Sequence, residues 1–110
     1  MMTFDDDRER AFERKFALDQ ELAFKVAARR NALLGRWAAA RIGLHDVAAE
    51  AYVATLIEND IVHIDPQAVV RRVLDDLLAR GTPISREELD AVVTRLTARA
   101  RAEIVRGALR

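Results

Sequence analysis

Residues 5–42 read DDDRERAFERKFALDQELAFKVAARRNALLGRWAAARI, the longest uninterrupted helical pattern in the chain. The stretch contains no proline and a single glycine, so no strong helix breaker divides it. Apolar side chains recur at helical spacing through its second half: Leu22, Val26, Leu33, Leu34 and Trp37. We therefore predict one helix over residues 5–42, which at 1.5 Å per residue would be ~55 Å long.

Three patterns mark the starts of further helices. Ser85–Glu88 has the form of a capping box, in which the serine side chain accepts a hydrogen bond from the third backbone amide and the glutamate reaches back. Asp65–Pro66 suits an N-cap followed by the first helical position, where proline loses no hydrogen bond. Asp46 precedes another apolar run and is predicted to cap it.

Two glycines mark helix ends. Gly43 and Gly81 each follow a helical run and suit the left-handed position just after a helix. Together with the start signals, they predict further helices over residues 47–59, 66–80 and 86–106.

The further helices carry apolar stripes, which are densest in the third and fourth. The predicted stripe residues are Val47, Ala48, Ala51, Tyr52 and Leu56, then Val69, Val70, Val73, Leu74, Leu77 and Leu78, and finally Leu89, Val92, Val93, Leu96, Ala100 and Ile104. Residues 61–64 are predicted to form a short extended plug over the end of the bundle. The expected fold is all-α, a small antiparallel four-helix bundle with short loops and a long N-terminal helix that protrudes or is partly disordered.

The first helix is too long for such a bundle. Helices two and three would each be ~20 Å long and the fourth ~30 Å. The N-terminal overhang, residues 1–19, is therefore left without an intramolecular partner, and residues 20–110 form the bundle domain. The overhang nevertheless holds three of the four phenylalanines, Phe4, Phe12 and Phe16.

The overhang has the composition of a partner-binding helix. Phe12 and Phe16 are one turn apart and share a helix face, and the opening acids favour the positive end of the helix dipole. Isolated helices of fewer than ~12–15 residues are marginal in water. We expect the overhang to fray or be disordered in the free protein and to fold as an amphipathic helix in a groove of a partner. The alternative is that it folds back and its phenylalanines join the core.

Composition excludes several classes of protein. Eighteen basic residues balance 18 acidic ones, which argues against a generic electrostatic grip on nucleic acid or anionic lipid. The absence of cysteine excludes disulfides and thiolate chemistry. No apolar run of about 18 residues predicts a membrane span, and the acidic N-terminus argues against a secretory signal. We expect a reduced, cytoplasmic compartment.

Other chemistry-bearing residues have simpler explanations. His45 and His63, with Asp46 and Glu50 nearby, are interpreted as surface residues and not as metal ligands. Ser85 is interpreted as a cap and not as a nucleophile, because no histidine is placed to act as its base. We therefore expect no catalytic residue, no metal and no enzymatic activity.

The overhang and the helix behind it resemble a known family. The order of acidic, basic and aromatic residues is distinctive: Phe4-Asp5-Asp6, Arg8-Glu9-Arg10-Ala11-Phe12-Glu13 and Lys15-Phe16-Ala17, followed by Glu21-Leu22, Phe24-Lys25, Ala28-Arg29-Arg30-Asn31, Leu33-Leu34-Gly35 and Trp37-Ala38-Ala39. It looks like the start of the zeta inhibitor subunit of the alphaproteobacterial F-type ATP synthase. The resemblance is dense over about the first 40 residues and looser afterwards, at Gly43-Leu44 and Ala49-Glu50-Ala51-Tyr52.

The resemblance implies a four-helix protein that inhibits ATP hydrolysis by the catalytic head. In that family the N-terminal segment enters an interface between the catalytic alpha and beta subunits, beside the gamma subunit of the central stalk, and blocks rotation while the bundle stays outside. The residues implied in this contact are Phe4, Asp5, Asp6, Arg8, Glu9, Arg10, Phe12, Glu13, Lys15 and Phe16. The implied location is cytoplasmic and peripheral to the inner membrane through the enzyme, with a monomeric free protein that does not itself insert into the membrane.

Two alternatives remain at this level. The family has been associated with nucleotide binding by the bundle, which would place Arg29, Arg30, Arg36 or Arg41 against phosphates of an adenine nucleotide and make the chain a helical nucleotide sensor. The other alternative is a helical adaptor of a different complex. The same arginines could also suggest nucleic acid, but we interpret them as a solvated helix face and expect DNA binding to be absent or weak at physiological salt.

Overall fold

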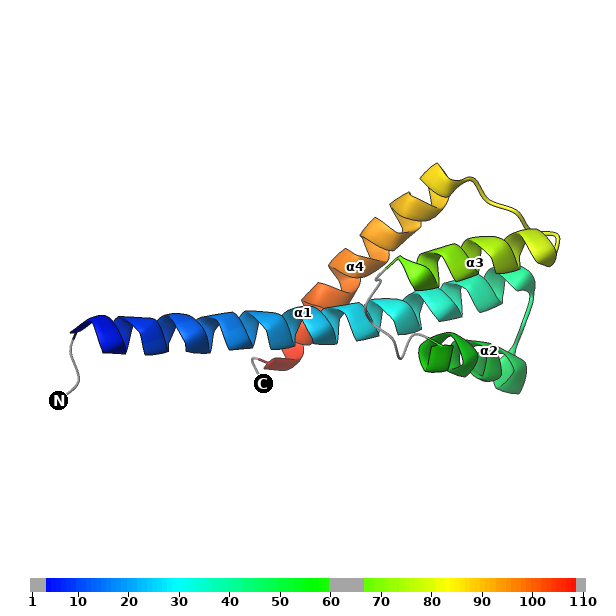
Figure 1. Cartoon of the computed structure of the whole chain (residues 1–110). Coiled ribbons are helices and arrows are strands. Elements are labelled where there is room, and N and C mark those ends of the chain that lie inside the picture. The colour runs from blue at the N-terminus through cyan, green and yellow to red at the C-terminus, as the bar shows by residue number, and fades with distance from the viewer. Residues whose placement is uncertain (1–3, 60–66, 109–110) are drawn as a thin grey trace.

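The chain is seen in a computed structural model that describes residues 4–59 and 67–108. Within these residues it forms helices only: α1 (Phe4–Ile42), α2 (Asp46–Asn59), α3 (Ala68–Ala79) and α4 (Arg86–Ala108) (Figure 1). The predicted all-α class and the order of the helices are confirmed. The predicted plug over residues 61–64 and the predicted start at Asp65–Pro66 lie outside the described residues, and Gln67 occupies the N-cap position of α3.

α1 is the element around which the others are arranged. It runs unbroken for 39 residues, which corresponds to about 58 Å of helix, and the molecule is 66 Å long but only 28 × 23 Å across. α1 contacts each of the other three helices, and α3 also contacts α4. All three companions lie along the second part of α1, so its first part projects alone (Figure 1).

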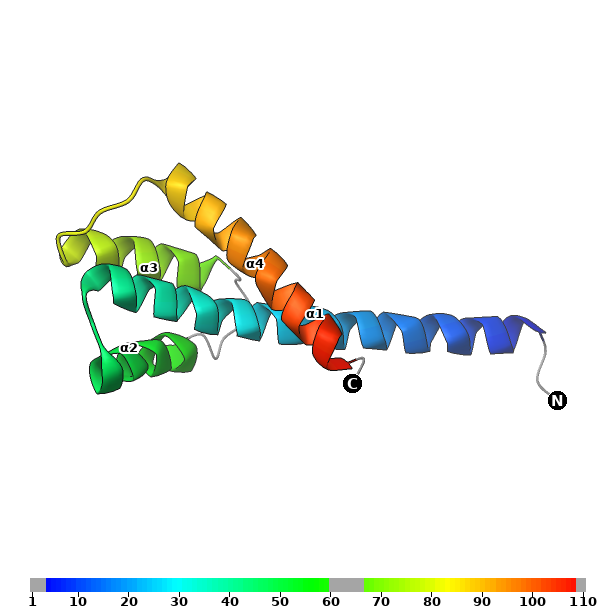
Figure 2. The ribbon, with the colours of Figure 1, turned by 180° about the vertical axis from the view of Figure 1, so that it is seen from behind.

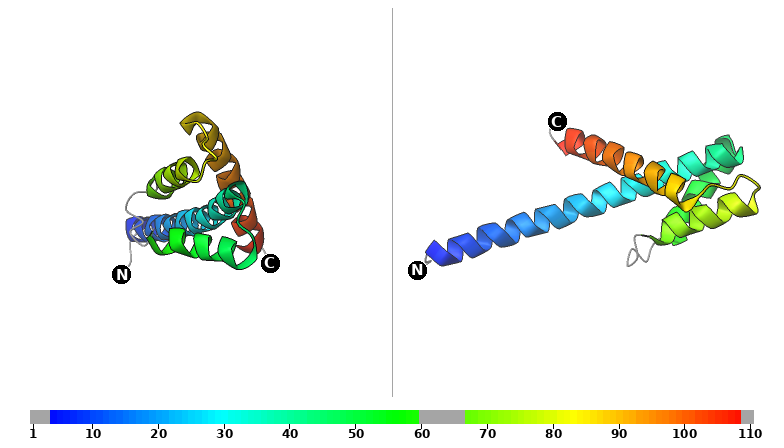
Figure 3. Two further views of the ribbon diagram at one scale, coloured as in Figure 1. Left: turned by 90° about the vertical axis from the view of Figure 1, so that its right-hand side faces the viewer. Right: turned by 90° about the horizontal axis from the view of Figure 1, so that it is seen from above.

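The helices alternate in direction, as predicted, but they do not form a regular bundle. α2 runs back along α1, and α3 runs forward again (Figure 1). α4 returns obliquely and crosses α1, as the view from behind in Figure 2 and the view from above in Figure 3 both show. Beyond the crossing, the last turn of α4 lies to one side of α1, as the view from above shows (Figure 3).

The core surrounds the second half of α1. The residues without exposed surface or nearly so include Leu34, Leu56, Val70, Val73, Leu77 and Leu89. Gly35 lets α1 and α2 approach closely, because a Cβ atom at this glycine would be 3.3 Å from side-chain carbons of both Val53 and Leu56. Val53 is buried although the predicted stripe of α2 omits it.

Four residues of the predicted stripes are exposed. Val47 is 82% exposed and Leu78 is 69% exposed, and Ala48 and Ala51 also face solvent. The reason is that α2 and α3 are each covered on a narrow face. On α3 this face contains Leu77, and Leu78 follows about 100° further around the helix.

The helix ends predicted from Gly43 and Gly81 agree with the structure to within one residue, whereas α4 continues two residues beyond its predicted end at 106. Gly43 has φ 95° and Gly81 has φ 79°, in the region that favours glycine. Beyond α1, the amide of Leu44 donates to the carbonyl of Ala39 at 2.9 Å. This is the hydrogen bond of a Schellman motif that spans six residues. The connection after α3 repeats this arrangement.

The start of α4 agrees with the predicted capping box in part, whereas the predicted cap of α2 is wrong by one residue. The backbone amide of Glu88 donates to Ser85 Oγ at 3.1 Å, as the capping box requires, but the Glu88 carboxylate accepts from the serine hydroxyl at 3.0 Å. Asp46 is the first residue of α2 and not the residue before it. Its φ of 51° is one that aspartate adopts more readily than most residues.

Candidate functional site

The candidate site is the N-terminal overhang, and its described side chains are all exposed. Residues 5–21 have no buried or half-buried member. Phe12 is 71% exposed and Phe16 is 58% exposed. The alternative in which this segment folds back onto the bundle is therefore wrong for this structure. The side chain of Phe4 lies outside the described residues.

The two phenylalanines lie on the same line of α1 as its core-facing residues. Eighteen residues make about five helical turns, so Phe12 lies in register with Arg30 and Phe16 with Leu34. Leu34 is fully buried and Arg30 is 8% exposed. The face that α1 buries in the bundle thus continues into the overhang as an aromatic face, where no other helix covers it.

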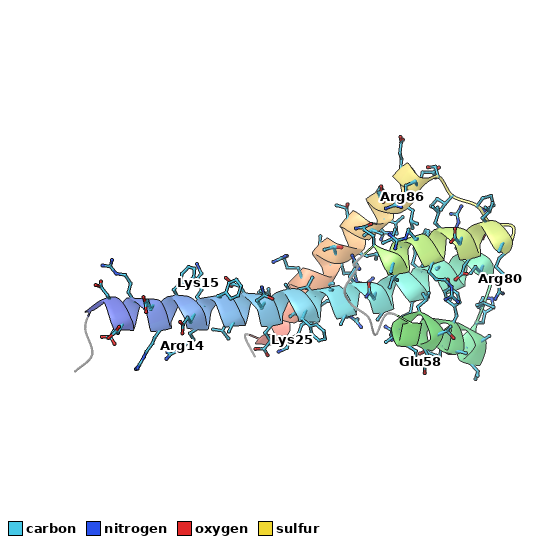
Figure 4. The ribbon with its side chains drawn as sticks, in the orientation of Figure 1. Arg14, Lys15, Lys25, Glu58, Arg80 and Arg86 are labelled. Atoms are coloured by element: carbon cyan, nitrogen blue, oxygen red, sulfur yellow. The ribbon has the colours of Figure 1, made fainter. Side chains whose placement is uncertain are left out.

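Charged side chains surround this aromatic face. Asp5, Asp6 and Asp7 occupy the first turn, where the helix dipole favours negative charge. Arg14 and Lys15 project from different sides of the overhang (Figure 4). This distribution keeps an exposed apolar face in solution and gives it a polar rim, the usual anatomy of a protein–protein contact.

An ion-pair cluster fastens α4 to α1 behind the overhang. Arg29 Nε on α1 donates to Glu103 Oε2 on α4 at 2.6 Å, and Arg99 Nε donates to Glu103 Oε1 at 3.1 Å. The hydrogen bond from Arg29, and then the one from Arg99, lowers the pKa of the Glu103 carboxyl. The overhang therefore projects from the part of the molecule in which α1 and α4 are joined by this ion pair.

Comparison of the sequence with known protein families gives a match over most of the chain. A family model described as ATPase inhibitor subunit zeta matches residues 1–103. The chain belongs to this family. The match includes the overhang, α1 to α3 and α4 as far as Glu103, so the resemblance noted for the first 40 residues extends over nearly the whole chain. No curated protein matches the chain.

Membership in the zeta family identifies the chain as an inhibitor subunit of an ATPase, which is a regulatory role. Within residues 4–59 and 67–108, no group of three or more histidine, aspartate and glutamate side chains is placed to hold a metal ion. His45 is exposed, and His63 lies outside the described part of the chain. None of the helices described has both the length and the apolar character needed to cross a membrane.

The arginines of the nucleotide hypothesis have different surroundings in the structure. Arg29 is bonded to Glu103, as described above. Arg30 is buried and donates from Nε and Nη2 to Asn31 Oδ1 at 3.0 and 2.7 Å. Arg36 is exposed. A phosphate group at Arg29 or Arg30 would have to compete with these acceptors in the zeta chain.

The fourth arginine of that hypothesis has a structural role. Arg41 donates to the backbone carbonyls of Thr82 and Pro83 at 3.2 and 2.9 Å. Its guanidinium carbon also lies 5.8 Å from the centre of the Trp37 ring, within the range of a cation–π contact. Arg41 thus holds the connection between α3 and α4 against the end of α1.

A polar cluster between α2 and α3 is a feature that sequence reasoning missed. The Tyr52 hydroxyl donates to Asp76 Oδ2 at 2.8 Å, and Arg72 Nε lies 3.1 Å from the same oxygen. Burial, followed by the bond to Asp76, raises the pKa of Tyr52. A buried tyrosine needs a partner for its hydroxyl, but the sequence does not tell which polar residue of another helix supplies it.

Proposed function

We propose that this zeta family chain inhibits ATP hydrolysis by the catalytic head of the F-type ATP synthase. The overhang would enter the interface between catalytic alpha and beta subunits, next to the gamma subunit, and would block rotation in the hydrolytic direction. The observation that carries the proposal is the exposed aromatic face of Phe12 and Phe16, held on a helix that continues unbroken from the bundle.

Burial of the aromatic face supplies the driving force in this proposal. Each phenylalanine that moves from water into an apolar pocket contributes about 1.5–3 kcal/mol. The helical conformation of the overhang reduces the entropic cost of ordering it on the partner. The charged residues around the face, such as Arg8 and Glu13, would lie nearer the rim and would orient the helix more than they strengthen its binding.

The bundle would act as a stop. A single helix with its side chains is about 10–12 Å in diameter, whereas the molecule is 28 × 23 Å across at its widest. An interface that admits the overhang would therefore exclude the bundle. A rod that contacts the rotating stalk at one end and is held outside the head at the other would resist rotation.

The test is hydrolysis of ATP by the isolated catalytic head at increasing concentrations of the full chain. The proposal predicts loss of hydrolysis that saturates at one chain per head. Unchanged hydrolysis at saturating concentrations would refute it. In that case the adaptor and nucleotide-sensor hypotheses would remain.

A further inference from the structure

An open groove lies where α4 crosses α1. It has a volume of about 500 Å³, and its apolar lining consists of Leu18 and Leu22 from α1 and Ile104 from α4. Leu18 is 59% exposed, and Leu22 and Ile104 are half-buried. Lys25, which also lines the groove, marks its position close to the crossing in Figure 4, whereas Arg14 and Lys15 lie further out on the overhang.

The charges around the groove are already neutralised by one another. Lys25 Nζ lies 3.1 Å from Glu21 Oε1, and Glu103 is held by arginines of both helices. A charged ligand would therefore gain little from this rim and would have to displace an existing ion pair. The combination of an apolar floor and a paired rim favours an apolar side chain as the occupant.

Gly107 keeps one wall of the groove low. It lies on α4 one turn beyond Glu103 and Ile104 and lines the groove. A Cβ atom built at this position has no heavy atom within 4 Å. A larger side chain at position 107 would thus extend into open space in the free protein, while narrowing the groove to any occupant.

The groove and the aromatic face lie on different sides of α1. Leu18 follows Phe16 by two residues and is therefore about 200° further around the helix. A flat partner surface that covers the two phenylalanines leaves the groove open. If the partner's cleft instead surrounds the overhang as far as residue 19, the edge of the cleft lies at Leu18 and therefore at the mouth of the groove.

Because Leu18 belongs to the overhang and also lines the groove, we infer that the groove receives an apolar side chain from the edge of the cleft that takes the overhang. The inference rests on the proposed function and adds a second contact to it, formed by α1 and α4 together. It also makes the insertion specific: the partner encloses the helix on two sides and seats against the crossing of α1 and α4.

Two variants at one position test the inference by inhibition. Gly107→Phe adds a ring to the wall of the groove and narrows its mouth, whereas Gly107→Ala changes the backbone preference with little added bulk. Ala102→Phe places the same ring on an exposed side of α4 away from the groove. We expect Gly107→Phe to inhibit ATP hydrolysis at least about tenfold less effectively, the change expected when one well-buried contact is lost. The two other variants should inhibit as well as the wild-type chain. The two Gly107 variants should melt no lower than the wild type, because alanine and phenylalanine both favour helix over glycine, whereas Ala102→Phe should melt slightly lower, because phenylalanine is a weaker helix former than alanine.

A second measurement reports on the groove independently of inhibition. The chain has no cysteine, so Gly107→Cys and Ala102→Cys can each carry one environment-sensitive fluorophore. On addition of the isolated catalytic head, the label at position 107 should shift to shorter wavelength and the label at 102 should not. If the wild-type chain inhibits, but Gly107→Phe inhibits equally well and the label at 107 does not shift, the groove is not part of the contact, although the proposed function stands. If the wild-type chain does not inhibit, the proposed function fails first.

Discussion

Phe12 and Phe16 are the two side chains on which the proposed inhibition depends most. Both are large, apolar and exposed, and both lie in line with buried residues of the same helix. Isolated exposed apolar residues are common on protein surfaces, but two aromatic rings one turn apart on an uncovered helix form a contiguous patch of the kind that marks an interaction site. The sequence predicted this pair, because its spacing is local to one helix.

Replacement of both phenylalanines by alanine tests their role. Phe12→Ala with Phe16→Ala should weaken inhibition of ATP hydrolysis by about a hundredfold or more, since each ring contributes about 1.5–3 kcal/mol on burial and 1.4 kcal/mol corresponds to tenfold. The melting temperature should not change, because neither ring contacts the core. Lys15→Glu is the control at the rim and should cost less. A double variant with wild-type potency would show that the aromatic face is not the contact.

Leu77 and Leu78 provide a matched test of the core at residue scale. Leu77 has no exposed surface, whereas its neighbour Leu78 is largely exposed. Leu77→Ala should lower the free energy of unfolding by ~2–5 kcal/mol through lost burial and an internal cavity, and Leu78→Ala should change it by about 0.5 kcal/mol or less. Urea denaturation of both variants measures the difference. Equal losses would mean that the register of α3 is wrong.

Among the helices, features set by neighbouring residues were predicted from the sequence more accurately than features set by contacts between distant residues. The starts and ends marked by Ser85, Gly43 and Gly81 were predicted, because caps and left-handed glycines act within a few residues. The face that α2 buries was predicted less well, because alanines fit both a core and a surface. Val53 is buried because Gly35 of α1 lies opposite, and that pairing of distant residues is not visible in the sequence.

The overhang should also behave as a separate element in solution. The side chains of residues 5–21 are all exposed, so backbone amides up to about Asp19 should have lower order parameters than those near Trp37, reporting larger motions on the ps–ns timescale. ¹⁵N relaxation of the free chain measures this, with the buried part of α1 as the internal reference. Equal order parameters at Phe12, Phe16 and Trp37 would contradict the prediction that the overhang moves more than the buried part of α1.

At the scale of the whole molecule, the mismatch between helix lengths accounts for the shape. One helix of 39 residues is combined with helices of 14, 12 and 23 residues, and the excess length projects as the overhang (Figure 1). Element lengths are readable from sequence, so the projecting helix was predicted. The oblique path of α4 was not, because crossing angles depend on how side chains of two helices interlock. The groove beside Gly107 exists only through that crossing.

We propose that the overhang carries the inhibitory contact and that the bundle folds without it. The most direct test is deletion of residues 2–16, followed by thermal melting of the truncated chain and by titration of ATP hydrolysis by the isolated catalytic head. The truncated chain should melt cooperatively near the temperature of the full chain, because the core begins beyond the deletion, and it should no longer inhibit hydrolysis. A folded truncated chain that inhibits as strongly as the full chain would show that the overhang is not the inhibitory segment.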